Sequence, residues 1–339
     1  MRKCIKFPSI EQFRHVVKHV TENSKFEGLD ENNNPIFNPL KECPTLEFKG
    51  TVKLHGTNAG ISYNNEEGMW YQSRENIITP QKDNAGFAFW ADSKKDIFKE
   101  IIDSLNIDLD NNTVTIFFEW IGKGIQKGVA VSELQKAAVV IGCKITPNNE
   151  DDNAWWIDHS NIRNNEHRIF NILDFKTFSV IINFNDPLLS QNEIVNLTIE
   201  VEDECPFGKH FGVSGIGEGI VFSYTYPNGT VIRFKSKGEK HQKSKVITLK
   251  NVDEDKIKAI NNFCEGILPQ WRLDQGIENV FDVLNGGSID ISKTGNYIKW
   301  IMDDILKEES DLLVEHNLSP KDISKKVSEI SKKYLFSKI

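Results

Sequence analysis

The 339-residue sequence lacks several features that would place it in a specialised class of protein. No apolar run approaches the roughly 18 residues that a membrane-spanning helix needs. The five cysteines are odd in number and widely spaced, and no Cys-x-x-Cys pair occurs, so we expect neither a zinc site nor a disulfide framework. The first residues lack the apolar core of a signal peptide. We therefore expect a soluble cytoplasmic protein of a reducing compartment that does not engage a membrane.

An excess of positive charge is also missing. The chain has 41 Lys and Arg against 49 Asp and Glu, which gives a net charge of −8 and a pI of about 5.6. A strongly basic chain would indicate nucleic-acid binding over a broad surface, so here any site for a polyanion must be a local patch. The rest of the composition is that of an ordinary globular protein. The length predicts two domains, or one large domain with an appendage.

The first two thirds of the chain mix helical and β patterns. Residues 9–12 have the spacing of a capping box, and the apolar residues that follow predict a helix to about residue 21. Residues 23–44 are polar and contain several prolines, which predicts a loop. Alternating apolar and polar residues then predict strands through residues 45–90. Further expected elements are helices at 92–105 and within 187–203, and strands at 114–120, 137–145, 215–224 and 231–237.

The pattern changes after about residue 245. Apolar residues now recur at helical spacing, as in Ile298, Ile301 and Ile305. We therefore expect an α+β domain over residues 1–245, followed by a small all-helical C-terminal domain over residues 246–339.

One short stretch, Thr51-Val52-Lys53-Leu54-His55-Gly56-Thr57-Asn58, puts a lysine between a strand end and a glycine that permits a tight turn. A lysine in this position is most often a solvated residue at the edge of a strand. Lysine acts as a nucleophile only as the neutral amine, which requires burial or neighbouring cations. Lys53 by itself leaves both interpretations open.

A basic strand offers such cations. Arg233, Lys235 and Lys237 alternate, so their side chains share one face. This pattern is typical of a polyphosphate contact, although a solvated edge strand protected from aggregation would look the same. The basic character continues toward the expected domain junction with Lys240, His241, Lys243 and Lys245. That segment could bind a nucleic-acid backbone or be a solvated linker.

Two acidic residues stand beside apolar strands. Glu119 ends the strand at 114–120, and Glu218 lies between two glycines just before another strand. A carboxylate in such a place needs an ion-pair partner or a bound cation. Magnesium held together with nucleotide phosphates uses one or two carboxylates. A structural ion pair is the commoner explanation for either residue alone.

The order of five motifs favours the functional interpretation of these residues over the structural one. The chain has Lys53-Leu-His-Gly, Ser73-Arg74, Glu119, Glu218-Gly-Ile-Val221 and Lys235-Ser-Lys237. This order resembles the covalent nucleotidyltransferase superfamily of ATP-dependent ligases and capping enzymes. His55 stands where most members have aspartate, and with Asn58 and the stretch Gly124-Ile-Gln-Lys-Gly-Val129 it is similar to phage-type nick-sealing and RNA-editing RNA ligases. The resemblance covers about residues 5–240.

The resemblance implies a fold and a chemistry. The fold would be an α+β nucleotidyltransferase domain, with an ATP-grasp-like arrangement of two antiparallel sheets around an ATP cleft. Lys53 would take AMP from ATP as a phosphoramidate. Lys235 and Lys237 would complete the catalytic set by holding the ATP phosphates and stabilising their charge. Glu218 would bind the catalytic metal, Mg²⁺, with Mn²⁺ as an alternative.

The resemblance also implies a nucleotide-binding set. Asn58 and Arg74 would contact the nucleotide phosphate and later the nucleic-acid end. His55 would orient phosphate, and Glu119 would hold the ribose or support the metal. Val221 would pack on one face of the adenine.

One position departs from the family. The strand Ala137–Ile145 carries no aromatic residue, although relatives use one there to stack on adenine. Ile141 could replace it as an apolar lid, and Phe170 is a second candidate that fits a protein core better. The pair Trp155-Trp156 could stack on exposed bases or pack a surface loop.

Together the motifs predict an ATP-dependent RNA ligase that joins 3′-hydroxyl and 5′-phosphate ends of RNA through lysyl-AMP. We expect a monomer that acts on nicked duplexes or RNA ends. A DNA ligase or a capping enzyme is an alternative, although these usually carry a β-barrel after the last motif. A non-catalytic RNA-binding protein of the same fold is the alternative from another class.

Overall fold

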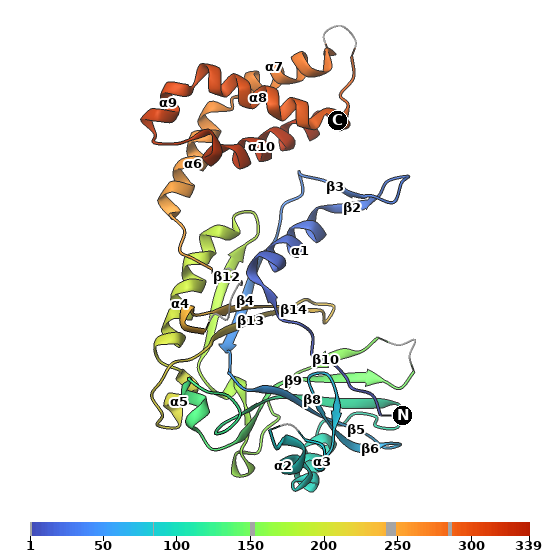
Figure 1. The fold of residues 1–339 in the computed structure, drawn as a ribbon. Helices are drawn as coiled ribbons and strands as arrows, with labels where there is room; N and C mark the ends of the chain where they lie inside the picture. The colour runs from blue at the N-terminus through green and yellow to red at the C-terminus, as the bar shows by residue number, and fades with distance from the viewer. Residues whose placement is uncertain (1, 84, 150–152, 242–248, 284–286) are drawn as a thin grey trace. The chain divides into compact units, whose positions relative to one another are not determined.

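A computed structural model describes residues 2–83, 85–149, 153–241, 249–283 and 287–339 (Figure 1). The chain forms two compact units. Unit 1 contains Met1–Val17, Thr45–Ile182 and Ser190–Lys250, and unit 2 contains Lys18–Pro44, Asn183–Leu189 and Asn251–Ile339. The predicted boundary at 245/246, with Lys243 and Lys245, lies outside the described residues.

Unit 1 is built on two large, mostly antiparallel sheets (Figure 1). The five-stranded sheet has the order β1-β14-β13-β4-β12, in which β1 pairs with β14 in parallel and β13 pairs with β14 and β4 antiparallel. Its strands are β1 (Glu11–Gln12), β4 (Thr45–Val52), β12 (Thr177–Asn183), β13 (Gly219–Thr225) and β14 (Val231–Lys237). The turn between β13 and β14 contains Gly229 at φ +82°, a conformation that glycine adopts without strain.

The second sheet of unit 1 has seven strands in the order β10-β9-β8-β5-β6-β7, with β11 paired in parallel to β9. Its strands are β5 (Thr57–Asn64), β6 (Gly68–Ser73), β7 (Ile77–Ile78), β8 (Asn112–Ile121), β9 (Ala137–Pro147), β10 (Trp155–Ile157) and β11 (Ile169–Asn171). The short connection 53–56 runs from β4 in the first sheet to β5 in the second. The stretch around Lys53 therefore lies where the two sheets meet.

Alternation along the strands separates a core face from a cavity face in each sheet. In the five-stranded sheet Phe48, Phe222 and Phe234 are fully buried, and the rings of Phe222 and Phe234 stack at 5.0 Å. In the seven-stranded sheet the core face packs against α2 (Phe87–Asp92) and α3 (Lys95–Asp103). The polar residues between these apolar positions face the opposite side, where the candidate site lies.

Three sequence predictions about element boundaries are wrong. The first helix, α1 (Phe13–Lys25), does not begin at the capping-box residues, because Glu11 and Gln12 pair with β14 as strand β1. Residues 23–44 are not all loop, since β2 (Phe26–Leu29) and β3 (Pro35–Phe37) form an antiparallel hairpin. The strands expected through residues 45–90 end earlier, because α2 occupies Phe87–Asp92, whereas α3 lies within the helix expected at 92–105. Pairing with the distant strand β14 decides the first case, which local residue preferences do not register.

Two helices of unit 1 follow β12 in the chain, and the first of them packs against β13 and β14. They are α4 (Gln191–Asp203) and α5 (Pro206–His210). Thr198 of α4 donates a hydrogen bond of 2.8 Å to Ser236 of β14, and both side chains are buried. This bond fixes the core side of the strand that carries Lys235 and Lys237.

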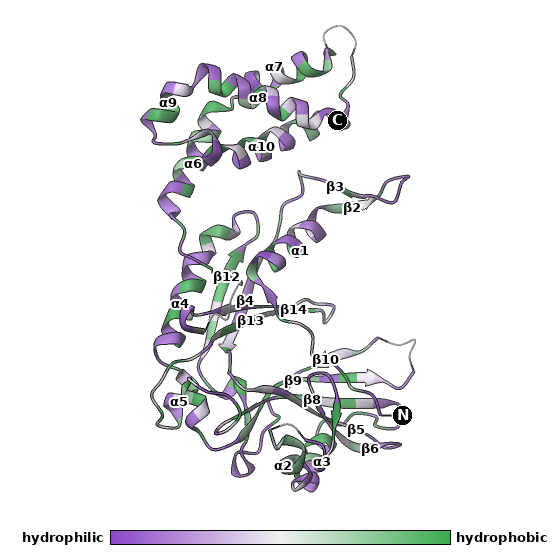
Figure 2. Cartoon of the chain, in the orientation of Figure 1, coloured by the Kyte–Doolittle hydropathy of each residue, from purple (hydrophilic) through white to green (hydrophobic). Residues whose placement is uncertain are grey.

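The C-terminal part of unit 2 is helical, as predicted. Its helices are α6 (Glu254–Ile267), α7 (Gln270–Phe281), α8 (Thr294–Glu308), α9 (Ser310–Glu315) and α10 (Pro320–Phe336). They carry hydrophobic and hydrophilic residues in alternation (Figure 2), and the apolar residues form one core around Tyr297, Ile301 and Val327. The α+β class with C-terminal helices is confirmed. Among the described residues no helix is long and apolar enough to cross a membrane.

Candidate active site

Lys53 lies at the end of β4, where its main chain is tied to the neighbouring strand. The Lys53 N–H donates a 2.8 Å hydrogen bond to the Gly219 carbonyl oxygen. Gly219 has φ +143°, and a Cβ there would collide with the carbonyl oxygen of Ser236. Only glycine fits this close approach, so the sequence Glu218-Gly219 brings the carboxylate beside the lysine.

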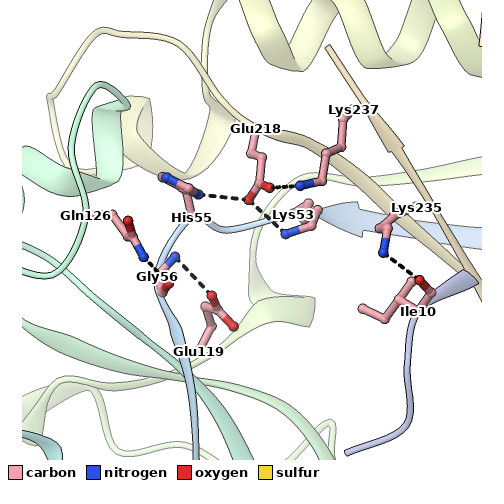
Figure 3. A network of polar contacts seen from close by, with 9 residues as sticks. All are labelled: Ile10, Lys53, His55, Gly56, Glu119, Gln126, Glu218, Lys235 and Lys237. Atoms are coloured by element: carbon pink, nitrogen blue, oxygen red, sulfur yellow. Dashed lines mark hydrogen bonds and ion pairs between the residues drawn. The ribbon is translucent and has the colours of Figure 1, made fainter. Parts of the chain in front are cut away.

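Glu218 is the centre of a cluster of two lysines and a histidine (Figure 3). Its Oε2 accepts from Lys53 Nζ at 2.8 Å and lies 3.3 Å from His55 Nδ1, while its Oε1 lies 2.6 Å from Lys237 Nζ. The Glu218 side chain is 4% exposed. One buried carboxylate thus joins the two lysines and the histidine of the first and last motifs.

These contacts decide the ionisation of Glu218. Burial raises the pKa of a carboxyl group, but the hydrogen bond from His55 and the charges of Lys53 and Lys237 outweigh it and hold the pKa of Glu218 well below its usual range. The carboxylate therefore stays negative at any physiological pH. It is available as a ligand for cations, whether lysine ammonium groups or a metal ion.

Glu119 is the second carboxyl group near Lys53. It projects from β8 and accepts a 2.9 Å hydrogen bond from the Gly56 N–H, while Gln126 donates to the Gly56 carbonyl oxygen at 3.2 Å. Burial raises the pKa of Glu119 to about 7, against the opposing effects of Lys53 and the Gly56 hydrogen bond. The Gly56 peptide is thus held on both sides, which fixes the turn after Lys53.

The remaining cations of the motifs lie at the rim. Lys235 Nζ donates to the Ile10 carbonyl oxygen at 2.7 Å. Burial, together with the charges of Lys237 and Lys53, lowers the pKa of Lys235. Arg74 is largely exposed and forms an ion pair with Glu75 at 3.7 Å. The buried Oδ1 atom of Asn58 has no hydrogen-bond partner in the described part of the chain.

The structure brings eight of the nine predicted site residues to one cavity of about 340 Å³ between the two sheets. The eight are Lys53, His55, Asn58, Arg74, Glu119, Glu218, Lys235 and Lys237. Val221 lies instead in a cavity of about 810 Å³, which shares Lys53, Glu119 and Ile141 with the first. The ends of five motifs therefore line two adjoining cavities that we call the lysine cavity and the large cavity.

The large cavity contains three residues that were not among the nine predicted site residues. Trp156 of β10 lines it, as do Phe7 of the N-terminal segment and Arg233 of β14. Phe7 and Trp156 pack edge to face at 5.4 Å. The pattern of the sequence placed Trp156 in a polar surface excursion, because its packing partners lie about 40 and 150 residues away. No local signal could have found Phe7.

The candidates for the adenine lid separate clearly. Ile141 lines both cavities. Phe170 lines neither, because it packs against Phe175 and Phe211 in an aromatic cluster of the core. Trp155 is 42% exposed and also lies outside both cavities. Phe170 therefore has no access to a nucleotide in this structure.

Comparison of the sequence with known protein families identifies the family of this chain. Residues 46–237 match the family described as RNA ligase. The chain belongs to the RNA ligase family. The matched range begins in β4 and ends at Lys237, so it contains all nine predicted site residues. The resemblance seen in the motifs is confirmed at the level of the family.

The similarity to solved structures of RNA ligases is low. They include the Naegleria gruberi RNA ligase with PPi, at 15% identity and a TM-score of 0.43 over 70% of this chain. Mutants of the same ligase with AMP and Mn, and with ATP and Mn, match at 15% and 16% identity with TM-scores of 0.43. This chain spans 57% of the length of these ligases. A search of curated proteins found no match.

Proposed function

We propose that the protein is an ATP-dependent RNA ligase that works through a lysyl-AMP intermediate. The observation that carries the proposal is the cluster in which Lys53, His55 and Lys237 meet on the buried Glu218. A structural ion pair needs one cation, whereas this carboxylate has three partners at the floor of an open cavity. Membership of the RNA ligase family supports the same chemistry.

In the first step the Lys53 nitrogen attacks the α-phosphorus of ATP. A nitrogen–phosphorus bond forms, the bond to pyrophosphate breaks, and the amine loses a proton. Lys235 and Lys237 stand on the same face of β14. They are suited to hold the departing phosphates, because fixed positive charges stabilise the charge that develops on the phosphate oxygens.

In the second step AMP moves from Lys53 to the 5′-phosphate of an RNA end. In the third, a 3′-hydroxyl displaces AMP and closes the phosphodiester. Arg74 is exposed at the rim of the lysine cavity, where it could contact the incoming RNA phosphate. Asn58 has a buried polar atom free to bond a ligand. His55 could orient the phosphate beside Lys53.

Glu218 is our candidate for holding Mg²⁺ or Mn²⁺, with Glu119 as a second carboxylate close by. The described residues contain no group of three or more His, Cys, Asp or Glu side chains that could hold a metal ion unaided. Two carboxylates still fit Mg²⁺, which takes one or two from the protein and completes its shell with phosphate oxygens and water. Glu218 already has three partners, so at least one must move when the ion binds. The ion would supply neutralisation of phosphate charge.

Transfer of label from ATP tests the proposal. The protein is incubated with ATP labelled at the α-phosphate and Mg²⁺, and GTP is tested in parallel. We expect acid-labile AMP on the wild-type protein and none on Lys53→Ala. Lys49→Ala is the matched control, because Lys49 also lines the large cavity from β4 but lies outside the lysine cavity. Absence of label with every nucleotide would instead support a non-catalytic RNA-binding protein.

Sealing assays define the substrate. Nicked RNA duplex, single-stranded RNA and nicked DNA are compared at equal concentration, and we expect RNA to be sealed fastest. Better sealing of an all-DNA nick would exclude the RNA assignment and favour the DNA ligase alternative. Label with GTP and none with ATP would favour a capping-type enzyme.

We propose in addition that the protein works as a monomer on RNA ends or nicks inside the cell. The five cysteines are all free in the structure, which fits a reducing compartment. Sedimentation of the purified protein, alone and with a nicked RNA duplex, tests the oligomeric state.

A further inference from the structure

Arg233 is a partly buried cation without a charged partner. Its guanidinium carbon lies 4.5 Å from the centre of the Trp156 ring and 5.3 Å from that of Phe7. Within the described residues it has no ion pair and donates no hydrogen bond. Burial lowers the pKa of Arg233 to about 10. A guanidinium carries five N–H donors, so this one presents unused donors in the large cavity that it lines.

A second buried arginine shows what this chain does when the charge is purely structural. Arg272 of α7 pairs with Asp304 at 2.9 Å and with Glu309 at 2.7 Å, and it also donates to the Ile267 carbonyl oxygen. Two carboxylates and a carbonyl thus compensate for the loss of water. Arg233 has aromatic rings in their place, and these leave the edge of the guanidinium open.

The carboxylates that line the large cavity do not fill this role. Glu47 accepts from the Ser179 hydroxyl at 2.6 Å, Asp158 accepts from Ser160, and Glu119 accepts from Gly56. None lies within ion-pair distance of Arg233. An arginine kept away from the carboxylates of its own cavity is suited to a ligand that brings hydrogen-bond acceptors with it.

The position of Arg233 along β14 indicates which part of a ligand it meets. Lys237, Lys235 and Arg233 follow one another on the same face of the strand, at steps of about 7 Å. The two lysines line the lysine cavity and Arg233 lines the large one. A nucleotide with its phosphates at the lysines would therefore direct its base toward Arg233. Val221, which pairs with Lys235, lies between these two ends.

The strands around Trp156 are shaped to hold its ring at this place. A bulge leaves Ile141 without a partner, since Phe117 pairs with Gly142 and Phe118 with Val140. A Cβ on Gly142 would lie 3.0 Å from the Trp156 ring and 3.4 Å from Phe7. The absence of a side chain at position 142 thus makes room for the ring on which Arg233 rests.

We propose that Arg233 reads the base of the nucleotide, by donating hydrogen bonds in its plane to a ring nitrogen that accepts, and that Trp156 is the positioning residue that holds the guanidinium in that plane. This inference rests on the proposed function. Adenine offers acceptor nitrogens at N1, N3 and N7, and an arginine presents only donors. The side chain thus supplies polar recognition in a pocket that Ile141 and Val221 line with apolar groups.

Two variants separate this role from a structural one. Arg233→Ala should raise the KM for ATP in adenylylation by about tenfold or more, the usual size of a lost charged hydrogen bond, with little change in kcat. Sealing of RNA that already carries a 5′-adenylyl group should then change less. Lys144→Ala is the matched control, because Lys144 also stands over the Trp156 ring, at 5.9 Å, but lines neither cavity. Trp156→Phe should keep most of the affinity and Trp156→Leu should lose it.

ATP analogues identify the contact itself. The 1-deaza, 3-deaza and 7-deaza forms each lack one acceptor nitrogen. We expect one of them to bind wild-type protein about tenfold more weakly than ATP, and to bind Arg233→Ala no more weakly than ATP does. Equal affinity of all three for the wild type, or the same loss in both proteins, would overturn the role of Arg233.

Calorimetric titration with ATP measures binding without catalysis, so it tests the role of Arg233 independently of the ligase activity. If wild-type protein binds ATP but acquires no AMP, the ligase proposal fails while the analogue titration still decides the inference. If Arg233→Ala binds ATP as tightly as the wild type does, the inference fails while adenylylation of Lys53 can still be present.

Discussion

The lysine cavity and the large cavity adjoin each other, yet their cations have different partners: a carboxylate in the first and aromatic rings in the second. In the lysine cavity a buried carboxylate gathers Lys53, His55 and Lys237 within 3.3 Å. In the large cavity Arg233 lies on Trp156 and Phe7, and no carboxylate of the described residues forms an ion pair with it. Under the proposed function, the first arrangement positions the lysines that meet the ATP phosphates. The second leaves the N–H donors of Arg233 available among apolar side chains, which suits recognition of a nucleotide base.

Removal of the carboxylate from the lysine cavity should have the largest effect. Glu218→Gln keeps the shape but leaves two lysines without their anion, so we expect adenylylation to fall by about 10²- to 10³-fold, as for loss of a preorganised electrostatic group. Rapid-quench measurement of AMP transfer gives the rate. Glu202→Gln is the control, since Glu202 is also buried but lies outside both cavities. An equal loss there would mean that the effect of Glu218→Gln is structural.

The backbone that positions the carboxylate should be the next most sensitive feature. Gly219→Ala forces a Cβ against the Ser236 carbonyl oxygen at a φ that other residues avoid. We expect the free energy of unfolding to fall by about 2–4 kcal/mol, the sum of overpacking and backbone strain, and adenylylation to fall with it. Denaturant titration measures the first quantity.

Gly229→Ala separates the effect of backbone strain from that of a steric clash. Gly229 also has a positive φ, in the turn between β13 and β14, but nothing lies within 4 Å of its Cβ position. We expect a loss of about 1 kcal/mol and normal adenylylation. If the two variants lose equal stability, the contact with Ser236 does not matter.

The pH dependence of stability should reveal the second carboxyl group of the lysine cavity. The pKa of Glu119 is raised from 4.5 to about 7 in the folded protein, so the folded state binds more protons than the unfolded state between these values. Its contribution to stability is therefore present below about pH 4.5 and is lost as the pH rises toward 7, by about 1–3 kcal/mol. Thermal unfolding at pH 5 and pH 8 should show a smaller decline for Glu119→Gln than for the wild type. Parallel declines would contradict the assignment.

The smallest effect is expected on the aromatic side of the large cavity. Gly142→Ala places a methyl group 3.0 Å from the Trp156 ring, which must shift slightly. We expect the KM for ATP to rise about threefold, equivalent to about 0.6 kcal/mol, with adenylylation otherwise intact. Gly266→Ala in α6, where nothing lies within 4 Å, should leave the KM unchanged. A loss as large as that of Glu218→Gln would mean that the two cavities do not act separately.

Much of the lysine cavity could be predicted from sequence because its groups belong to short motifs. Each motif stands at the end or beginning of a strand, where spacing along the chain fixes which side chains project together. The order from Lys53 to Lys237 therefore indicated both the family and the set of residues. The motifs did not predict that Lys53, His55 and Lys237 all contact the carboxylate of Glu218. This arrangement depends on the close packing of Gly219 against Ser236.

The aromatic side of the large cavity was beyond prediction for a physical reason. Phe7, Trp156 and Arg233 come from three distant segments, and an aromatic ring has no motif that tells whether it faces a ligand or a core. Phe170 packs against Phe175 and Phe211, as its expected fit to a protein core implies, whereas Trp156 lines the cavity although a surface-loop role was the alternative for it. Strand β1 was missed for the same reason, because its partner β14 is distant in sequence. The hairpin of β2 and β3 is a local pairing, and it was missed because polar residues and prolines favoured a loop.

The sequence by itself determined the α+β class, the helical C-terminal part, the RNA ligase family and the set of charged side chains, since periodicity and short motifs are local properties. Only the tertiary structure decided how those charges pair and which aromatic rings face the large cavity. Pairing and burial depend on distances between segments, and the order of residues along the chain does not contain those distances.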